Sequence, residues 1–388
     1  MNKIPDTLQK IYLFLFIIII AISNIPNYLI HNEDIIGLSY FCYFCYIFFY
    51  VYIFFKRLRF TKASAIIFIV AAYLVIAPTL INGEPPYLFS LRFLFQDIAF
   101  ISVIIVGIEM VNCCDSYRIL STLGKLYVYC SFILMVSWIG MLTGSIPVVD
   151  EERNYDLKNF YNVYFIMSTF PLLWFSGYFT SKRQKLLLFW GMTNVACFCY
   201  FSATRSILLT CLMILVFFFV IKRSFFLLLI SLPLVFVVAY YSASNNLLVT
   251  RIQSMELKEE SRFEEAIELM NQCIKNDFLW LGSGLGSGFF SSLKEVKDDP
   301  INSPHIGILV LILKGGLCLF FIVVAYFISF IIRLFFDSHE VNRAISCSIC
   351  VFFLSSLLSG GYYIYPLLIL GVMLGFLSKN SNCPTSYA

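Results

Sequence analysis

Two arginines and one histidine, far apart in the sequence, have the chemistry needed to handle a phosphate-bearing substrate: Arg205, Arg262 and His305. A guanidinium group stays charged at ordinary pH and can bind a phosphate through two parallel hydrogen bonds. His305 follows Ser303 and Pro304, which predict the N-cap and the first residue of a helix. Because a helix N-terminus disfavours a cation, we expect a neutral imidazole that can accept a proton. Together these groups suit a lipid-linked phosphate or pyrophosphate and a nucleophile that must be deprotonated.

A glycine-rich stretch, "LGSGLGSGF", lies between the second arginine and the histidine and could bring backbone amides to an anion. Glycines let such a turn bend freely, and its exposed N–H groups can form an anion-binding nest. The candidate backbone contacts are Gly282, Gly284 and Gly286. Lys314 precedes Gly315 and Gly316, where we expect a bend, and we expect this lysine near the outer membrane interface as an accessory cation. The stretch is not an ATP-binding loop, because no Gly-Lys-Ser/Thr follows and the spacing differs from G-x-G-x-x-G.

Each of these features also has a purely structural interpretation. Arg205 could snorkel to the interface, as long basic side chains do. Arg262 could form a salt bridge with Glu259 or Glu265, and His305 could be an ordinary interfacial residue. The glycine-rich stretch could be a flexible connector. The functional interpretation requires that these groups converge on one face of the protein.

The elements that must position these residues are long apolar helices. Of the 388 residues, 60% are hydrophobic and only 13% are charged. A soluble chain of this length needs far more polar surface, and a helical bilayer span takes about 20 apolar residues. We therefore predict an all-α, polytopic membrane protein with a single membrane domain over residues 1–388. Its twelve predicted spans are 11–30, 36–55, 63–81, 93–112, 126–144, 161–179, 186–201, 206–221, 224–241, 308–335, 344–360 and 363–378.

The lysines and arginines of the short connections set the orientation. One set of connections carries sixteen of them and the opposite set carries four, so the positive-inside rule places the first set in the cytoplasm. Both termini then lie in the cytoplasm, and residues 242–303 form one large outer loop. The net charge of +4 is explained by this topology. There is no basic aromatic patch, so we do not expect nucleic acid as a partner.

The outer loop should contain a helix. Ser261 followed by Glu264 has the pattern of a capping box, which predicts about four helical turns starting near Ser261 and places Arg262 in the first turn. A cation is disfavoured there, so an anionic ligand could compensate for it. The predicted packed face comprises Phe263, Ala266, Ile267, Met270 and Ile274, and the predicted exposed face comprises Glu265, Glu268 and Lys275. We expect Cys273, also in this loop, to be accessible from outside.

In order along the chain, "SATRSILL", "SRFEEAIELM", "LGSGLGSGF" and "SPHIGILVLILKGGL" resemble the O-antigen ligase and O-antigen polymerase superfamily. The resemblance covers residues 200–317 in motif detail and the whole chain in topology. It implies a bacterial inner-membrane enzyme with about a dozen helices and one large periplasmic loop, here residues 242–303. It also implies glycosyl transfer from an undecaprenyl-pyrophosphate-linked oligosaccharide, without a metal, another cofactor or a nucleotide sugar.

The resemblance also assigns roles. Arg205 and Arg262 would neutralise the pyrophosphate leaving group, and His305 would orient or deprotonate the acceptor hydroxyl. An acidic or polar residue is often found in the family where this chain has Lys314, so the role of this lysine stays open.

Three functions remain open at this stage. We favour an O-antigen polymerase, which passes the growing glycan to another lipid-linked repeat unit and could work with a chain-length regulator protein. An O-antigen ligase uses the same donor but passes the glycan to the lipid A core. A lipid-linked oligosaccharide flippase would have a similar number of spans, but such transporters show internal repeats and ionisable groups near the bilayer midplane. We find no clear repeat, and Asp97 and Glu109 lie near the ends of a predicted span.

Overall fold

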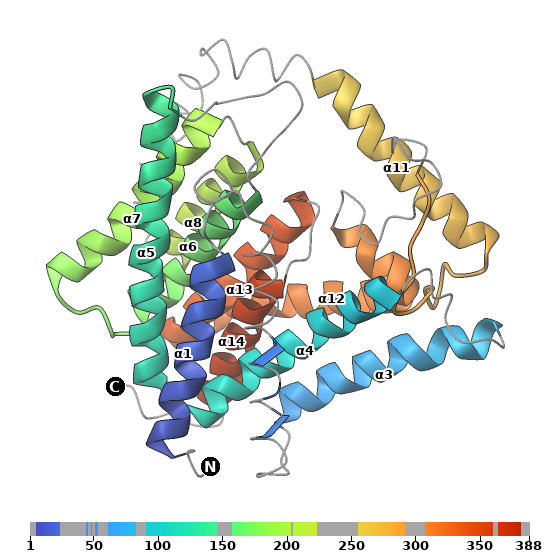
Figure 1. Cartoon of the computed structure of the whole chain (residues 1–388), viewed down its shortest axis with the longest axis horizontal. Coiled ribbons are helices and arrows are strands. Elements are labelled where there is room, and N and C mark those ends of the chain that lie inside the picture. Colours follow the sequence, from blue (N-terminus) through green and yellow to red (C-terminus); the bar gives the residue numbers. More distant parts are fainter. Residues whose placement is uncertain are drawn as a thin grey trace.

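The computed structural model describes most of the chain, and its regular structure there is helical, so the all-α prediction is confirmed for this part. The residues described are 5–23, 44–45, 48, 51–52, 61–82, 91–145, 157–202, 205–222, 255–291, 307–359 and 364–381. The helices, in chain order, are α1 (Asp6–Ser23), α3 (Lys62–Asn82), α4 (Leu91–Cys113), α5 (Ser116–Leu142), α6 (Leu157–Phe175), α7 (Lys182–Ser202), α8 (Arg205–Lys222), α11 (Met255–Lys275), α12 (Ile308–Phe336), α13 (Glu340–Ser359) and α14 (Ile364–Ser381) (Figure 1).

The helices follow the apolar runs of the sequence. All of them except α11 overlap a predicted span, whereas the predicted spans 36–55 and 224–241 fall largely or wholly outside the described residues. Within the described part, three helical stretches are long and apolar enough to cross a bilayer: Phe93–Cys113, Ser116–Leu142 and Ile308–Phe336. The total of twelve spans therefore stays a prediction, while the membrane character of the chain is supported.

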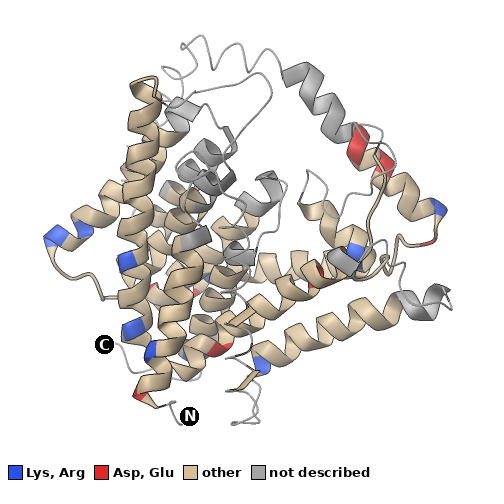
Figure 2. Ribbon diagram, in the orientation of Figure 1, with Lys and Arg blue, Asp and Glu red and all other residues tan. Residues whose placement is uncertain are grey.

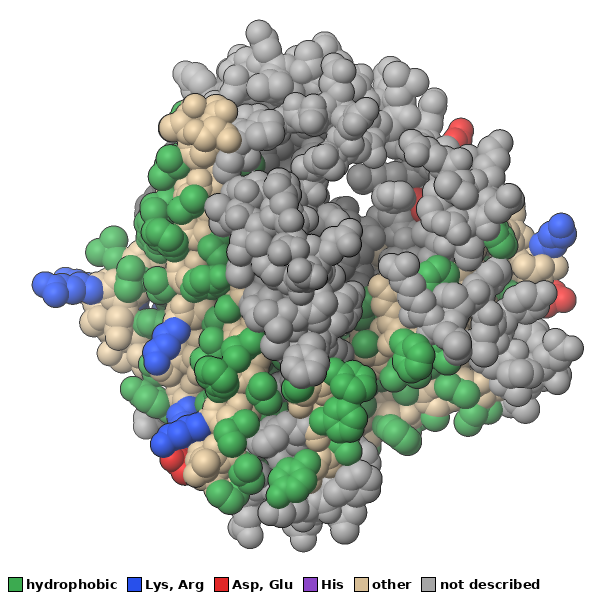
Figure 3. Space-filling view, in the orientation of Figure 1, with side chains coloured by type: hydrophobic (Ala, Val, Ile, Leu, Met, Phe, Trp, Pro, Cys, Tyr) green, Lys and Arg blue, Asp and Glu red, His purple; other side chains and the backbone are tan. Residues whose placement is uncertain are grey.

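Large apolar side chains also cover the outside of the bundle, where lipid would replace water as the solvent. Figure 3 shows hydrophobic side chains spread over much of the visible described surface. The exposed ones include Phe14, Phe68, Ile69, Phe95, Phe132, Phe189, Phe321 and Phe336. A water-soluble protein would not expose so many large apolar groups on helices that already bury another face.

Basic residues gather where one set of helix ends meets. Lys379, at the end of α14, donates from Nζ to the carbonyl of Val111 at 3.1 Å and to the hydroxyl of Ser116 at 2.8 Å. Lys222, at the end of α8, forms an ion pair with Glu340, at the start of α13, at 3.0 Å. We call the surface formed by the start of α1, α5, α7 and α13 and the end of α4, α6, α8 and α14 the basic face. In the view of Figure 2 it lies along the lower left, where many of the blue segments are found.

Aromatic and cation–π contacts connect neighbouring helix ends at the basic face. The Lys222 ammonium lies 4.9 Å from the centroid of the Phe175 ring, at the end of α6. Shortly after α6, the Tyr178 ring packs edge-to-face on Tyr117, near the start of α5, with centroids 4.9 Å apart. Since α8 ends at this face, its first residue, Arg205, lies at the opposite end of the helix, about 26 Å away along the axis.

The opposite side of the molecule carries α11. This helix packs on the first segment of α12 through a small apolar cluster that includes Leu269, Cys273, Phe289, Leu309 and Leu313. In Figure 1, α11 lies at the upper right, away from the helix ends of the basic face. Three residues separate the end of α12 from the start of α13, so α12 ends at the basic face. Its first residues therefore lie toward the opposite side.

Candidate functional site

We call the side of the molecule that carries α11, opposite the basic face, the outer side. Its polar centre is a break in α12. Gly316 has φ 65° and ψ −171°, which interrupts the helix and confirms the predicted bend. A Cβ at this position would collide with the backbone of Trp280, so only glycine fits. The break leaves helical carbonyl and N–H groups without partners inside α12, and in an apolar environment these groups must be satisfied by other parts of the chain.

Residues 279–289, which we call the glycine loop, fill the break and satisfy those groups. The carbonyl of Leu313 accepts hydrogen bonds from the Ser283 N–H at 2.8 Å and from the Ser283 hydroxyl at 2.7 Å. The carbonyl of Lys314 accepts one from the Gly284 N–H at 3.0 Å. On the other side of the break, Leu317 N–H donates to the carbonyl of Leu279 at 2.9 Å. The glycine loop therefore replaces the missing helical hydrogen bonds in both directions.

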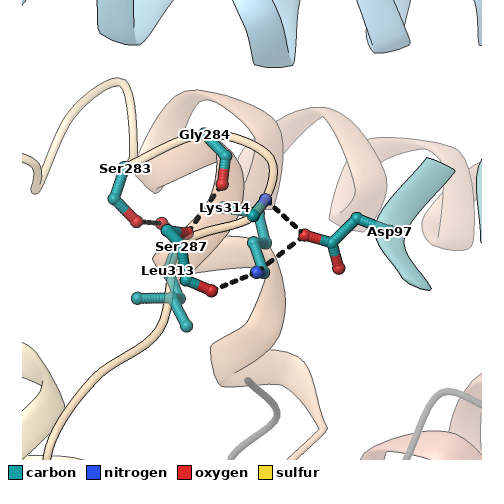
Figure 4. A network of polar contacts seen from close by, with 7 residues as sticks. Asp97, Ser283, Gly284, Ser287, Leu313 and Lys314 are labelled. Carbon is teal, nitrogen blue, oxygen red and sulfur yellow. Dashed lines mark hydrogen bonds and ion pairs between the residues drawn. The ribbon is translucent and has the colours of Figure 1, made fainter. Parts of the chain in front are cut away.

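A buried ion pair lies at the centre of this arrangement (Figure 4). Lys314 Nζ is 2.8 Å from Asp97 Oδ2, and the two residues are only 5% and 6% exposed. The same ammonium donates to the carbonyl of Ser287 at 2.5 Å, and the same carboxylate oxygen accepts from the Gly286 N–H at 2.8 Å. Each charge is therefore hydrogen-bonded to the glycine loop as well as to its partner, which offsets the cost of burying it.

The glycine loop also contacts α3. Leu285 N–H donates to the carbonyl of Leu74 at 3.4 Å, and the Tyr73 hydroxyl donates to the carbonyl of Gly315 at 3.0 Å. Asp97 is six residues into α4 and Lys314 six residues into α12, which places both about 9 Å inside the outer ends of their helices. The glycine loop is therefore a re-entrant segment held between α3, α4 and α12.

Two sequence-based expectations about this region change. Lys314, which we expected near the outer interface as an accessory cation, is buried and paired with Asp97. The amides of Gly282, Gly284 and Gly286 already donate within the chain, to the carbonyls of Phe278 and Lys314 and to the Asp97 carboxylate respectively. In this conformation the loop amides hold an internal carboxylate, and a role for them toward a substrate stays a prediction.

The expected description of α11 needs correction. The helix begins at Met255, so Ser261 lies inside it and is not an N-cap, and Arg262 is well past the first turn. The macrodipole argument for an anion beside Arg262 therefore fails, because the effect is confined to the helix end. The packed face is also rotated from the prediction: Glu265 is buried, at 2% exposed, along with Leu269 and Cys273.

The residues of the predicted packed face show the same rotation. Ile267 and Ile274 are more than half exposed, and Ala266 and Met270 are only partly buried. The end of α11 is instead tied to the end of the glycine loop, where Gln272 Nε2 donates to the carbonyl of Phe290 at 2.5 Å and Gln272 Oε1 accepts from its N–H at 3.1 Å. These two hydrogen bonds join the end of α11 to the backbone that directly follows the glycine loop.

Cys273 is not the accessible thiol that we expected. Its side chain is 2% exposed in the cluster between α11 and α12, and burial raises the pKa of the thiol to about 11. A buried, protonated thiol reacts slowly, since the thiolate is the nucleophile.

The structure locates the three candidate site residues, Arg205, Arg262 and His305, only in part. The backbone of Arg205 begins α8, at the end remote from the basic face, and that of Arg262 lies in α11; their side chains lie outside the described part of the chain. His305 also falls outside the described residues, and α12 begins at Ile308, later than the sequence predicted. The elements that carry the two arginines therefore share one side of the molecule, while contact between the side chains stays a prediction.

Sequence reasoning missed Asp97 as part of this centre. A signal was present, because an acid inside one apolar helix and a lysine inside another imply each other: neither is stable in lipid alone. We placed Asp97 near the end of its span and Lys314 near an interface, and so did not connect them.

Comparison with known proteins returns nothing: no family model, no curated protein and no solved structure matches the chain. The resemblance to the O-antigen ligase and polymerase superfamily thus continues to rest on the sequence motifs.

Proposed function

We propose that this protein is a membrane glycosyltransferase that polymerises lipid-linked oligosaccharide repeat units, an O-antigen polymerase. The observation that carries the proposal is the docking of the glycine loop into the break of α12, together with the packing of α11 on the first segment of α12. Both lie on the side of the molecule that also holds the start of α8. This arrangement gathers the elements that carry Arg205 and Arg262, and the start of the helix that follows His305, on one side.

The chemistry follows from the residue types. The donor is an oligosaccharide linked to undecaprenyl pyrophosphate, whose pyrophosphate leaves as an anion. The two guanidinium groups stabilise the negative charge that grows on the leaving group in the transition state. His305 accepts the proton of the attacking sugar hydroxyl, a contribution of about 10²–10⁴-fold. The exposed apolar helices give the lipid tail of the donor a surface to lie against.

The orientation follows from the basic face. By the positive-inside rule this face is cytoplasmic, which puts α11 and the proposed site in the periplasm and both termini in the cytoplasm of a bacterial inner-membrane protein. Lipid-linked repeat units and a chain-length regulator protein are the expected partners.

The first experiment tests whether Arg205 and Arg262 are needed for polymerisation rather than for the fold. Arg205→Ala and Arg262→Ala should each leave the amount of membrane protein unchanged and remove long polymer from a lipopolysaccharide gel. Lysine at either position should restore only part of it, because an ammonium cannot make the bidentate contact. Arg183→Ala is the matched control, since Arg183 is an exposed arginine at the basic face. Full polymer in both alanine variants would show that the arginines are structural.

The second experiment tests His305 with purified protein and lipid-linked repeat units. His305→Ala should keep donor binding, because the arginines still hold the pyrophosphate, and lose turnover by about 10²–10⁴-fold. His305→Gln keeps a hydrogen bond but cannot take a proton, so it separates orientation from proton removal. A glutamine variant with the wild-type rate would reduce His305 to an orienting group.

Gel analysis of a deletion strain separates polymerase from ligase. Loss of a polymerase leaves the core with a single repeat unit, whereas loss of a ligase leaves the bare core. We favour the polymerase because the chain is rich in Phe and Tyr and its resemblance to the family is loose, as expected where the sugar differs between strains.

One observation favours a flippase as a second candidate. Transporters often have broken helices with buried charges, and α12 is broken beside a buried ion pair. The pair lies about 9 Å inside the outer helix ends, however, whereas the midplane of a bilayer core lies about 15 Å deep. Purified protein that extends lipid-linked repeats in detergent, with no second compartment, excludes this candidate.

A further inference from the structure

The glycine loop, α11 and the start of α12 form one packed unit. The apolar cluster of Leu269, Phe289 and Leu313 joins all three, and Ser291, just beyond the glycine loop, donates to Glu268 of α11 at 2.9 Å. The segment that contains His305 leads directly into the start of α12. Any shift of the glycine loop in the break of α12 would therefore move α11 with it.

The Asp97–Lys314 pair attaches this unit to the helix bundle, and each of the two residues has a fixed role as hydrogen-bond acceptor or donor. Asp97 on α4 only accepts, from Lys314 Nζ and from the Gly286 N–H. Lys314 only donates, to Asp97 and to the carbonyl of Ser287. An exchange of the two charges would keep the ion pair, but it would set a donor against the Gly286 N–H and an acceptor against the Ser287 carbonyl.

We propose that Asp97 and Lys314 are positioning residues, whose ion pair locks the glycine loop into the break of α12 and so sets the position of α11. The locking role stands on the geometry alone. Its consequence for glycosyl transfer rests on the proposed function. A simple charge-balance role differs from the lock in one respect: it needs opposite charges at the two positions, whereas the lock needs an acceptor at position 97 and a donor at position 314.

The test uses the full-length protein in membranes with a reporter thiol in the glycine loop. Ser287 is completely buried, so Ser287→Cys should be protected from a membrane-impermeant maleimide. Lys314→Met in this background removes the donor to the loop and leaves the carboxylate buried without its cation. We expect the reporter to react at least tenfold faster and long polymer to be lost.

Two double variants separate the lock from charge balance. Asp97→Asn with Lys314→Gln removes both charges but keeps an acceptor at position 97 and a donor at position 314. We expect this neutral pair to restore protection of the reporter and most of the polymer. Asp97→Lys with Lys314→Asp keeps opposite charges but inverts the hydrogen-bond roles, and here we expect an exposed reporter and no polymer.

The matched control is an ion pair that does not touch the glycine loop. Lys222→Met with Glu340→Gln removes the pair at the basic face, whose side chains are about 40% exposed, and should change neither readout. A protected, active charge-exchanged variant overturns the proposal, as does a protected reporter in Lys314→Met. If the exchanged variant does not accumulate in membranes, the neutral pair decides: protection supports the lock, and rapid labelling rejects it.

The two readouts keep the proposals apart. Reporter labelling needs no enzymatic activity, so it tests the lock even if the wild-type protein makes no polymer. Wild-type polymer together with the wrong labelling pattern rejects the lock alone.

Discussion

The two ends of α4 each bury one acid, and the acids are satisfied in different ways. Glu109, toward the basic face, accepts hydrogen bonds at Oε1 from the Thr61 hydroxyl at 2.9 Å and the Ser64 hydroxyl at 2.5 Å, at the start of α3. Asp97, toward the outer side, is satisfied by a lysine and a loop amide that lie more than 180 residues later in the chain. Both are 6% exposed, so burial alone does not distinguish them.

The difference in hydrogen-bond partners shows which elements each acid holds together. Glu109 completes the N-terminus of a neighbouring helix, where a carboxylate is favoured and hydroxyl and N–H donors are available. Asp97 joins α4 to the broken helix and the glycine loop, which also meet through an apolar cluster that includes Leu285 and Leu319. The basic end of α4 is thus held by hydroxyl donors to Glu109 and by Lys379, whose ammonium bonds to the Val111 carbonyl. The outer end is held by the buried Asp97–Lys314 ion pair, which is costly to disturb.

The largest expected effect comes from adding one methyl group at the break of α12. Gly316 and Gly177 both have positive φ, 65° and 72°, but a Cβ at Gly316 would meet the Trp280 backbone, whereas one at Gly177 meets nothing within 4 Å. Gly316→Ala should give no monodisperse protein by size-exclusion chromatography in detergent. Gly177→Ala, near the basic face, should cost only the strain of about 1–2 kcal/mol. Equal behaviour of the two variants would contradict the docked glycine loop.

The next largest effect is on stability, and it compares the contacts made by Asp97 with those made by Glu109. Lys314→Met should lower the free energy of unfolding by about 3–5 kcal/mol, because Asp97 keeps a buried charge without its cation. Glu109→Gln keeps an oxygen acceptor for the same hydroxyl groups and should cost about 1 kcal/mol. Thermal unfolding of the purified proteins gives both values. A larger loss in Glu109→Gln would reverse the comparison.

A smaller effect tests which serine caps a helix. Ser181 and Gln184 at the start of α7 form a reciprocal capping box, with both bonds at 3.2 Å. Ser181→Ala should therefore cost about 1 kcal/mol of stability. Ser261→Ala should cost nothing, because Ser261 lies within α11 and alanine is the better helix former. Thermal unfolding midpoints of the two variants measure this difference. A loss of stability in Ser261→Ala equal to that in Ser181→Ala would support Ser261 as the N-cap of α11.

A fourth test concerns accessibility rather than stability, and it compares cysteine labelling on the two sides of the membrane. Asn271→Cys on α11 should react with an impermeant maleimide in cells with a permeabilised outer membrane, and Thr180→Cys at the basic face should not. Native Cys273 should stay unreacted near neutral pH, and its labelling should rise as the pH approaches the thiol pKa of about 11. Labelling of Thr180→Cys but not of Asn271→Cys would invert the proposed orientation.

Apart from α11, the described helices were predictable, because each overlaps an apolar run of the sequence, and three of them contain a stretch long and apolar enough to cross a bilayer. The bend at Gly315–Gly316 was predictable for a similar reason, since paired glycines weaken a helix locally. The start of α11 was not: the capping pattern at Ser261 is a local signal, whereas the observed helix extends upstream to Met255.

The site itself was harder to predict because its contacts are long-range. Asp97 and Lys314 sit in different apolar runs, and periodicity says nothing about which helices become neighbours. The face of α11 was mispredicted as well: the helix buries Leu269 and Cys273, while Ile267 and Ile274 are more than half exposed.

The close packing of α4 on α14 has a consequence for the order of events during biosynthesis. A Cβ at Gly107 would lie 2.6 Å from the carbonyl of Leu368, so the fourth helix is shaped to receive the last one. Asp97 leaves the ribosome 217 residues before Lys314, a delay of about 10–40 s at bacterial and eukaryotic elongation rates. Throughout that interval α4 waits in the insertion machinery or the bilayer with an unmatched acid and an uncovered glycine face. Any truncated product that ends before α12 retains both defects, which marks it for quality-control proteolysis.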